Sequence, residues 1–153
     1  MKRFATIGLA VALAAMWTPA RAHDHHHGHE SYSAGEPGDP AKPSRTIEIE
    51  MSEMNYEPFE IEVNLGEQIR FVLHNAGTED HEFLLATTKD NLNHAAMMKK
   101  HPHMAHDEPN GARVAPRKTA EIVWKFTKPG TFEYSCLIPD HREYGMTGHV
   151  TVK

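Results

Sequence analysis

GTFEYSCLIPDHREYGMTGHVTV, residues 130–152, is the stretch that decides the fold of this chain. It contains the only cysteine, Cys136, followed by His141 and then Met146, with four residues between each pair. Polar and apolar residues alternate before the cysteine and after the methionine, which predicts two strands, at residues 131–135 and 149–152. A thiolate, an imidazole and a thioether are therefore expected on one loop between two strands.

These three donor types favour copper. Thiolate and thioether sulfur are soft ligands that favour Cu(I), and imidazole binds Cu(II) well. Two histidines, one cysteine and a weak axial methionine form the electron-transfer copper arrangement. The loop provides only one histidine, so a second is expected upstream, at the end of another strand. His81 meets this expectation, because it follows a strand-like run at residues 68–73 and the turn-rich segment NAGTED at residues 75–80.

With these residues in place, the sequence resembles the cupredoxin family. The resemblance rests on the pattern N-x-G-x(3)-H, formed by Asn75, Gly77 and His81, and on the later pattern C-x(4)-H-x(4)-M. It covers roughly residues 45–153. It implies an all-β Greek-key β-sandwich that holds one type 1-like copper ion, Cu(I) or Cu(II), at one end. The ligands that it implies are His81, Cys136 and His141 close to the metal and Met146 in the axial position.

One position departs from the family's pattern. Many cupredoxins place a small polar residue, often Asn, directly after the first histidine ligand, where it ties the two ligand loops together. Here that position holds Glu82, so the sequence does not predict the usual hydrogen bond between the loops.

Each predicted ligand also has an ordinary structural interpretation. A lone cysteine is most often a small buried hydrophobic residue. His81 can be a loop histidine and Met146 a core methionine. The spacing of the three loop residues and the flanking strands favour a metal site over these alternatives. Two further histidines, His74 and His149, are interpreted as structural or surface residues.

Residues 1–22 have the pattern of a secretory signal peptide. A basic start, Lys2 and Arg3, precedes an apolar run at residues 4–17, and Ala20-Arg21-Ala22 matches a cleavage site. The apolar run is short for a membrane span, although an uncleaved anchor is the alternative. We therefore expect export to the periplasm, with no membrane span after cleavage.

Composition limits the partners of the chain. Its 153 residues are enough for one domain, and 16 Lys+Arg against 21 Asp+Glu give a formal net charge of −5. Removal of the signal peptide makes the chain more acidic, which disfavours nucleic acid. Copper ions and a redox or copper-transfer protein remain as expected partners of a monomer. A single cysteine cannot form an internal disulfide, and metal binding accounts for its presence in an oxidising compartment.

Residues 23–44 begin HDHHHGHE and are otherwise rich in Gly, Pro and Ser. We expect this segment to be disordered, which leaves residues 45–153 as the cupredoxin domain. Cleavage after Ala22 would give an amino terminus, two amides and His25 as a square-planar nitrogen set suited to Cu(II) or Ni(II). An expression tag is the alternative. The predicted secondary copper ligands here are His23, His25, His26, His27 and His29.

Short alternating runs separated by turn residues predict an antiparallel sandwich. One run is expected to bury Phe59, Ile61 and Val63, and another to use Trp124 as a core anchor. The candidate strands before the ligand loop are residues 45–51, 54–63, 68–74, 81–87 and 119–127.

Residues 89–100 break this rhythm and predict a short helical insertion, with Leu92, Ala95, Ala96 and Met98 on one side. A polar loop with Pro and Gly follows. Methionine and histidine bind Cu(I) and Cu(II) respectively, so this part predicts a further copper site, with core packing and solvated loop residues as the alternative. Its candidate ligands are Met97, Met98, His101, His103, Met104 and His106.

Two functional classes remain, since no catalytic signature is found and we do not expect an enzyme. An electron carrier needs only the cupredoxin domain, with His141 as the exit edge and apolar loop residues as a docking patch. A copper-tolerance protein accounts also for the His-rich and Met/His segments. The whole arrangement resembles the periplasmic copper-resistance cupredoxins of bacteria, the CopI type, and this favours copper tolerance. The expected docking patch comprises Leu137, Ile138, Pro139, Tyr144 and Gly145.

Overall fold

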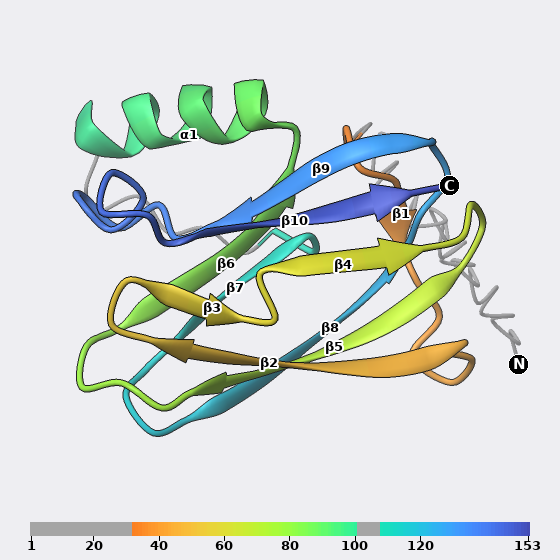
Figure 1. Ribbon diagram of the computed structural model, residues 1–153, viewed down its shortest axis with the longest axis horizontal. Helices are drawn as coiled ribbons and strands as arrows, with labels where there is room; N and C mark the ends of the chain where they lie inside the picture. Colours follow the sequence, from red (N-terminus) through yellow and green to blue (C-terminus); the bar gives the residue numbers. More distant parts are fainter. Residues whose placement is uncertain (1–31, 101–107) are drawn as a thin grey trace, which may run out of the picture.

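A computed structural model describes residues 32–100 and 108–153. Two five-stranded sheets pack face to face, and helix α1 lies on the outer side of the second sheet (Figure 1). The elements in chain order are β1 (Glu36–Pro37), β2 (Arg45–Ser52), β3 (Asn55–Glu57), β4 (Glu60–Val63), β5 (Gln68–Asn75), β6 (His81–Ala86), α1 (Thr88–Lys100), β7 (Gly111–Val114), β8 (Thr119–Lys125), β9 (Gly130–Ser135) and β10 (Thr147–Val152).

The predicted β-sandwich is confirmed, but it is mixed rather than purely antiparallel. The first sheet has the order β1-β8-β5-β2-β3 and the second the order β4-β10-β9-β6-β7. In the first, β2 runs parallel to β5, and in the second β4 runs parallel to β10. Alternation within a strand indicates which side is buried, not which strand lies next to it, so the sequence pattern did not reveal these pairs.

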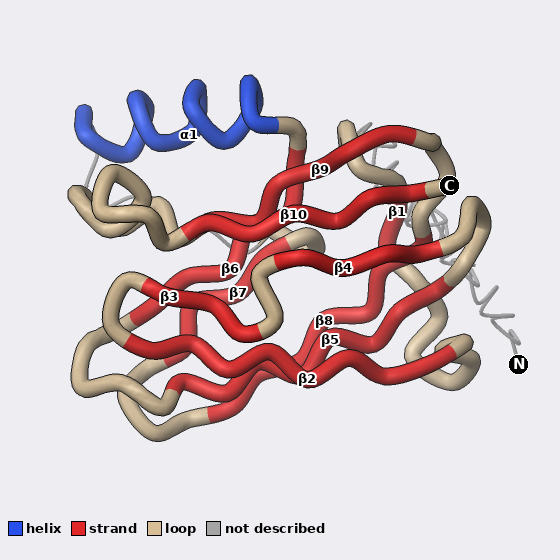
Figure 2. Tube along the Cα trace, in the orientation of Figure 1, coloured by secondary structure: helices blue, strands red, loops and turns tan. Residues whose placement is uncertain are grey.

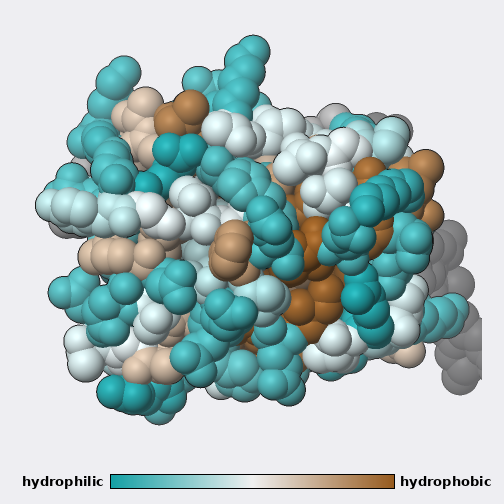
Figure 3. Space-filling view, viewed as in Figure 1, coloured by the Kyte–Doolittle hydropathy of each residue, from teal (hydrophilic) through white to brown (hydrophobic). Residues whose placement is uncertain are grey.

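The buried side of each strand follows the alternation of its sequence. Along β5, Ile69, Phe71 and Leu73 are fully buried, and Trp124 on β8 is the expected core anchor. The face of the molecule drawn in Figure 3 is largely hydrophilic. Figure 3 shows hydrophobic surface mainly around β4, where the edges of the two sheets meet.

The predicted single strand at residues 54–63 is wrong, because the structure divides it between the two sheets. β3 pairs with β2 in the first sheet, and β4 pairs with β10 in the second. Pro58 lies between them and has no N–H group with which to continue a strand ladder. Ile61 and Val63 are buried as expected, but Phe59 lies in the crossing and is 54% exposed.

Residues 32–44 are ordered, which corrects the expectation of a disordered segment, while residues 23–31 lie outside the described part. β1 pairs with β8, and Ala34 is fully buried. The indole N–H of Trp124 donates to the Ala34 carbonyl at 3.3 Å, and the Tyr32 ring meets the indole edge-on with centroids 5.4 Å apart. The composition of this segment did not predict its ordered structure, because the segment is held by backbone pairing and one aromatic contact and not by many apolar side chains.

Helix α1 confirms the predicted helical insertion (Figure 2), but only part of the expected side is buried. Thr87 precedes it, accepts a hydrogen bond from the N–H of Asp90 at 3.2 Å and donates to the Asp90 carboxylate at 2.7 Å. Asn91 and Met98 are buried, whereas Leu92 is 49% exposed. Thirteen mostly polar residues are too few for a membrane span, so none of the described helical structure crosses a bilayer.

Gly35 allows a test of the contact between β1 and β8. A Cβ atom at Gly35 (φ 142°) would lie 2.2 Å from the Lys125 carbonyl oxygen, whereas Gly130 (φ 132°) has open space around it. Gly35→Ala should therefore lower the free energy of unfolding by about 1–3 kcal/mol more than Gly130→Ala. Chemical denaturation followed by circular dichroism measures both variants. Equal losses would mean that β1 adds nothing to the folded state.

Candidate metal centre

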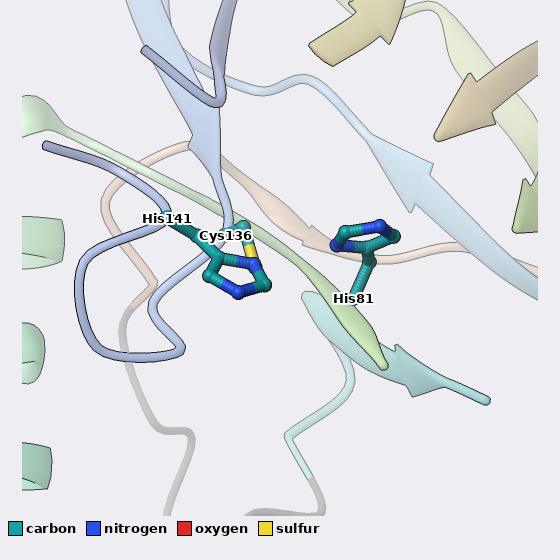
Figure 4. A group of neighbouring side chains, drawn as sticks. All are labelled: His81, Cys136 and His141. Atoms are coloured by element: carbon teal, nitrogen blue, oxygen red, sulfur yellow. The ribbon is translucent and has the colours of Figure 1, made fainter. Parts of the chain in front are cut away.

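Three side chains that could bind a metal ion converge at one end of the sandwich (Figure 4). His81 is the first residue of β6, Cys136 follows the last residue of β9, and His141 lies on the loop before β10. These three strands are neighbours in the second sheet, so their ends meet. One ligand atom from each residue lies within 4.8 Å of the others, and Cys136 Sγ is 3.3 Å from His141 Nδ1. The sequence-predicted cluster of close ligands is thus assembled in space.

The ligand loop, residues 136–146, is closed by its own backbone. The Cys136 N–H donates to the Met146 carbonyl at 3.2 Å, and the Met146 N–H donates to the His141 carbonyl at 3.1 Å. Gly145 has φ 106°, a conformation that favours glycine at this turn. The loop therefore returns Met146 to the buried cluster that contains Cys136, and both side chains are fully buried.

Asn75 fixes the segment that leads to His81. Its side-chain amide donates to the carbonyls of Glu79 at 2.7 Å and Val114 at 2.8 Å, and its Oδ1 accepts the Gly77 N–H at 2.9 Å. Val114 lies opposite His81 in the pairing of β6 with β7. The sequence pattern that contains Asn75 did not predict this role. An asparagine two residues before a glycine, in a turn-rich segment, is the signal that indicates it.

Glu82, the position that departs from the family's pattern, still connects the two ligand-bearing segments. Its backbone N–H donates to Cys136 Sγ at 3.3 Å, and its carbonyl accepts the hydroxyl of Tyr56. The Glu82 carboxylate lies 3.9 Å from the Arg113 guanidinium. The connection survives because every residue except proline has an N–H group, whichever side chain it carries.

A buried carboxylate, Glu133, holds the ligand loop to the helix. It accepts hydrogen bonds from Arg142 at 2.9 and 3.2 Å, from Asn91 on α1 at 3.2 Å and from Ser135 at 3.1 Å. Burial alone would raise the pKa of Glu133, but these hydrogen bonds and the charge of Arg142 outweigh it and lower the pKa. The Glu133 carboxylate therefore stays charged. It contacts Arg142, the residue after His141, and Ser135, the residue before Cys136.

Burial also sets the protonation of the metal donors. It raises the pKa of the Cys136 thiol to about 11, although backbone N–H groups of Glu82 and Ile138 act in the opposite direction. Burial lowers the pKa of His81, and a positive charge on His141 adds to the effect. At neutral pH the metal-free site therefore holds a protonated thiol and a neutral His81 imidazole.

The donor atoms fit a copper ion. Both ring nitrogens of His81 are buried without a hydrogen-bond partner, which costs free energy, and a metal ion bound at one of them removes that part of the cost. A buried cysteine, two imidazoles and a buried methionine are the donor set of electron-transfer copper sites. Copper held there would supply a one-electron Cu(I)/Cu(II) couple. The chain's own part is to hold the donors in place and exclude water.

The structure does not bring together Met97 and Met98, the two predicted secondary ligands that lie on α1. Met97 is 45% exposed and Met98 is buried, so the two side chains face different environments. His74 contacts Thr119 Oγ1 at 3.1 Å and His149 is exposed on β10, which agrees with structural and surface roles. The remaining candidates lie outside the described residues: His23, His25, His26, His27, His29, His101, His103, Met104 and His106.

Comparison with known families agrees with this geometry. The sequence profile of copper binding proteins of the plastocyanin/azurin family matches residues 43–153. This chain belongs to that family. The match includes β6, β9, β10 and the loop between the last two strands, so the cupredoxin fold and the copper cofactor expected from the sequence are confirmed.

Named relatives and a solved structure extend the comparison. The chain is 43% identical over 134 residues to the copper-resistant cuproprotein CopI of Rubrivivax gelatinosus, covering 86% of this chain and 81% of that protein. It is 34% identical over 148 residues to the CopI of Pseudomonas aeruginosa, covering 78% and 82%. Reduced auracyanin from Roseiflexus castenholzii aligns with a TM-score of 0.62 at 22% identity, covering 73% of this chain and 99% of auracyanin. That likeness concerns the fold.

Copper binding should release the Cys136 proton. Because the pKa of the thiol is about 11 without metal and copper binds the thiolate, the apparent Cu(II) affinity should fall about tenfold for each unit that the pH decreases between 9 and 7. His81, with its lowered pKa, stays neutral over this range. Competition with a chromophoric chelator of known pH dependence measures the affinity. An affinity independent of pH would contradict thiolate ligation.

Arg142→Ala should destabilise the fold more than Lys99→Ala, although both residues tether the ligand loop region. Removal of Arg142 leaves the Glu133 carboxylate buried without its cation, at a cost of about 3 kcal/mol. Lys99 makes an exposed pair with Glu143 at 2.7 Å, and its loss should have a much smaller effect. Urea denaturation of the metal-free variants measures the difference. Equal effects would show that Glu133 does not depend on Arg142.

Proposed function

We propose that this cupredoxin binds one copper ion through His81, Cys136, His141 and Met146 and acts in copper tolerance in the bacterial periplasm. The observation that carries the proposal is the buried cluster of His81, Cys136 and His141, whose ligand atoms lie within 4.8 Å of one another. The 43% identity with a protein named for copper resistance supports the physiological role.

The burial of the four residues supports their assignment as ligands. His81, Cys136 and Met146 are fully buried, and His141 is 6% exposed. An ion held there exchanges little with water and with small competing ligands. Such a site suits a protein that captures or transfers copper and must not lose it to the surrounding solution.

Electron transfer is the second candidate function. A ligand set that is assembled before the metal binds needs little rearrangement between Cu(I) and Cu(II), which favours a carrier. The expected apolar docking patch is, however, smaller than the sequence indicated. Leu137 is buried and Ile138 is partly buried, so Pro139 and Tyr144 are the larger exposed side chains of that group. We therefore place copper tolerance first.

Export and additional copper ions complete the proposal. The signal-like residues 1–22 support a periplasmic location, in which a mature chain would begin at His23. Its His-rich start and the Met/His residues that follow α1, His101, His103, Met104 and His106, would bind further copper and deliver it to, or hold it apart from, the buried site. An electron carrier has no need of these segments.

A copper titration tests the proposal. Purified mature protein should develop an intense thiolate-to-copper absorption band that saturates at one equivalent of Cu(II), since one thiolate is present. Cys136→Ala should abolish the band and yet take up copper at the other segments. Metal counting on both proteins separates the sites.

The outcomes distinguish the two functions. Uptake beyond one equivalent that the Cys136→Ala variant retains, together with copper sensitivity of a deletion strain, supports copper tolerance. Saturation at one equivalent, with loss of a respiratory or photosynthetic electron path in that strain, supports the carrier. Absence of the band in the unaltered protein would refute the copper site itself.

A further inference from the structure

Glu79 lies against the outer edge of the metal centre. Its Oε2 is 3.4 Å from His141 Nε2, on the opposite side of the imidazole from the Nδ1 that faces Cys136. The Glu79 side chain is 59% exposed, whereas the His141 side chain is 8% exposed. The carboxylate therefore stands between the imidazole and the solvent.

The neighbouring acidic residues are engaged with other groups. Glu53 accepts two hydrogen bonds, at 2.5 and 2.9 Å, from the residue before Glu79. Asp80 binds the Arg113 guanidinium at 2.9 and 3.0 Å. Within the described ranges, the ion-pair contact of the Glu79 carboxylate is the one with His141. The geometry thus singles out Glu79 among the acidic groups at this end of the molecule.

The backbone of Glu79 is fixed, so only its side chain has to adjust. The Glu79 carbonyl accepts the Asn75 amide at 2.7 Å, which anchors the segment before β6. From 3.4 Å, a small rotation of an exposed side chain brings a carboxylate oxygen into hydrogen-bond contact with a ring N–H. Glu79 belongs to the segment that carries His81, and His141 to the ligand loop. The contact therefore joins the two ligand-bearing parts of the chain.

We propose that Glu79 is a positioning residue of the copper centre: its carboxylate accepts the N–H of His141 Nε2, holds Nδ1 toward the metal and slows copper release. When Nδ1 of a neutral imidazole binds a metal, the ring proton must reside on Nε2, where it is a donor. A carboxylate that accepts this proton fixes the ring and strengthens the metal ligand. The inference rests on the proposed role of His141 as a ligand.

Glu79 also explains how the chain tolerates Glu82 at the position where its family often has asparagine. The Glu82 side chain lies toward Arg113, so the link between the two segments at that position is limited to a backbone N–H. Glu79 supplies a side-chain link on the solvent side of the same site. It also places a negative charge over the imidazole edge that an electron carrier would leave open, which agrees with retention of copper.

Copper release from three variants tests the inference. Glu79→Ala removes the acceptor, Glu79→Gln keeps an acceptor oxygen without the charge, and Glu62→Ala is the control. Glu62 is 72% exposed and pairs with Lys153, so its loss changes the net charge equally without touching the site. Each protein is loaded with one equivalent of Cu(II), and the thiolate-to-copper band is followed after addition of excess EDTA. The reduction potential of each is measured by redox titration.

Glu79→Ala should release copper about tenfold faster than the unaltered protein, as expected for loss of a group that orients a metal ligand. Glu79→Gln should be intermediate, because its amide oxygen still accepts the Nε2 proton. Glu62→Ala should release copper at the unaltered rate. The reduction potential should rise in both Glu79 variants, since a nearby negative charge that favours Cu(II) is removed, and stay constant in the control.

Two results would overturn the inference. One is an unaltered release rate and potential in Glu79→Ala while the band remains. The other is an equal acceleration in Glu62→Ala, which would assign the effect to net charge. In both cases the copper site itself would stand. If the unaltered protein shows no thiolate-to-copper band, the proposed function fails and this inference fails with it.

Discussion

Exclusion of water from the donor atoms of His81, Cys136 and His141 is the condition on which the rest of the structure depends. It leaves the two His81 nitrogens without a hydrogen-bond partner and raises the pKa of the thiol. Each polar atom in that state costs free energy, and a metal ion bound to one of the two nitrogens offsets the cost at that atom. The site is therefore suited to bind a metal ion. When no metal is bound, the rest of the β-sandwich has to provide the free energy that keeps the donor side chains together.

The surrounding chain meets that demand with buried polar contacts outside the donor set. Asn75 fastens the segment before His81 to the end of β7, and Glu133 fastens the ligand loop to α1 through Arg142 and Asn91. Both groups are buried and hydrogen-bonded, so they specify one arrangement rather than merely filling space. The apolar core fixes the sheets, and these polar contacts fix the loops upon them.

The sequence was sufficient to predict the cluster of candidate ligands, because the patterns that indicate it lie within short segments of the chain. Cys136, His141 and Met146 share one loop between two alternating strands, and His81 follows a turn with its own signal, so spacing alone brings them to one end of a sandwich. Features that depend on distant partners were not predictable in this way. Residues 32–44 are held by Trp124, the buried side of α1 is chosen by the polar contact of Asn91 with Glu133, and the Glu79–His141 contact joins two segments.

The burial of Cys136 has a consequence for the lifetime of the protein before it meets a metal. The thiolate is the form of cysteine that attacks disulfides and oxidants, and this reaction requires that the other reactant reach the sulfur. Cys136 is fully buried, so other molecules have little access to its sulfur. The pKa of its thiol is about 11, so little thiolate is present at neutral pH. A metal-free molecule can therefore persist under oxidising conditions without forming mixed disulfides or sulfenic acid, and remain competent to bind copper.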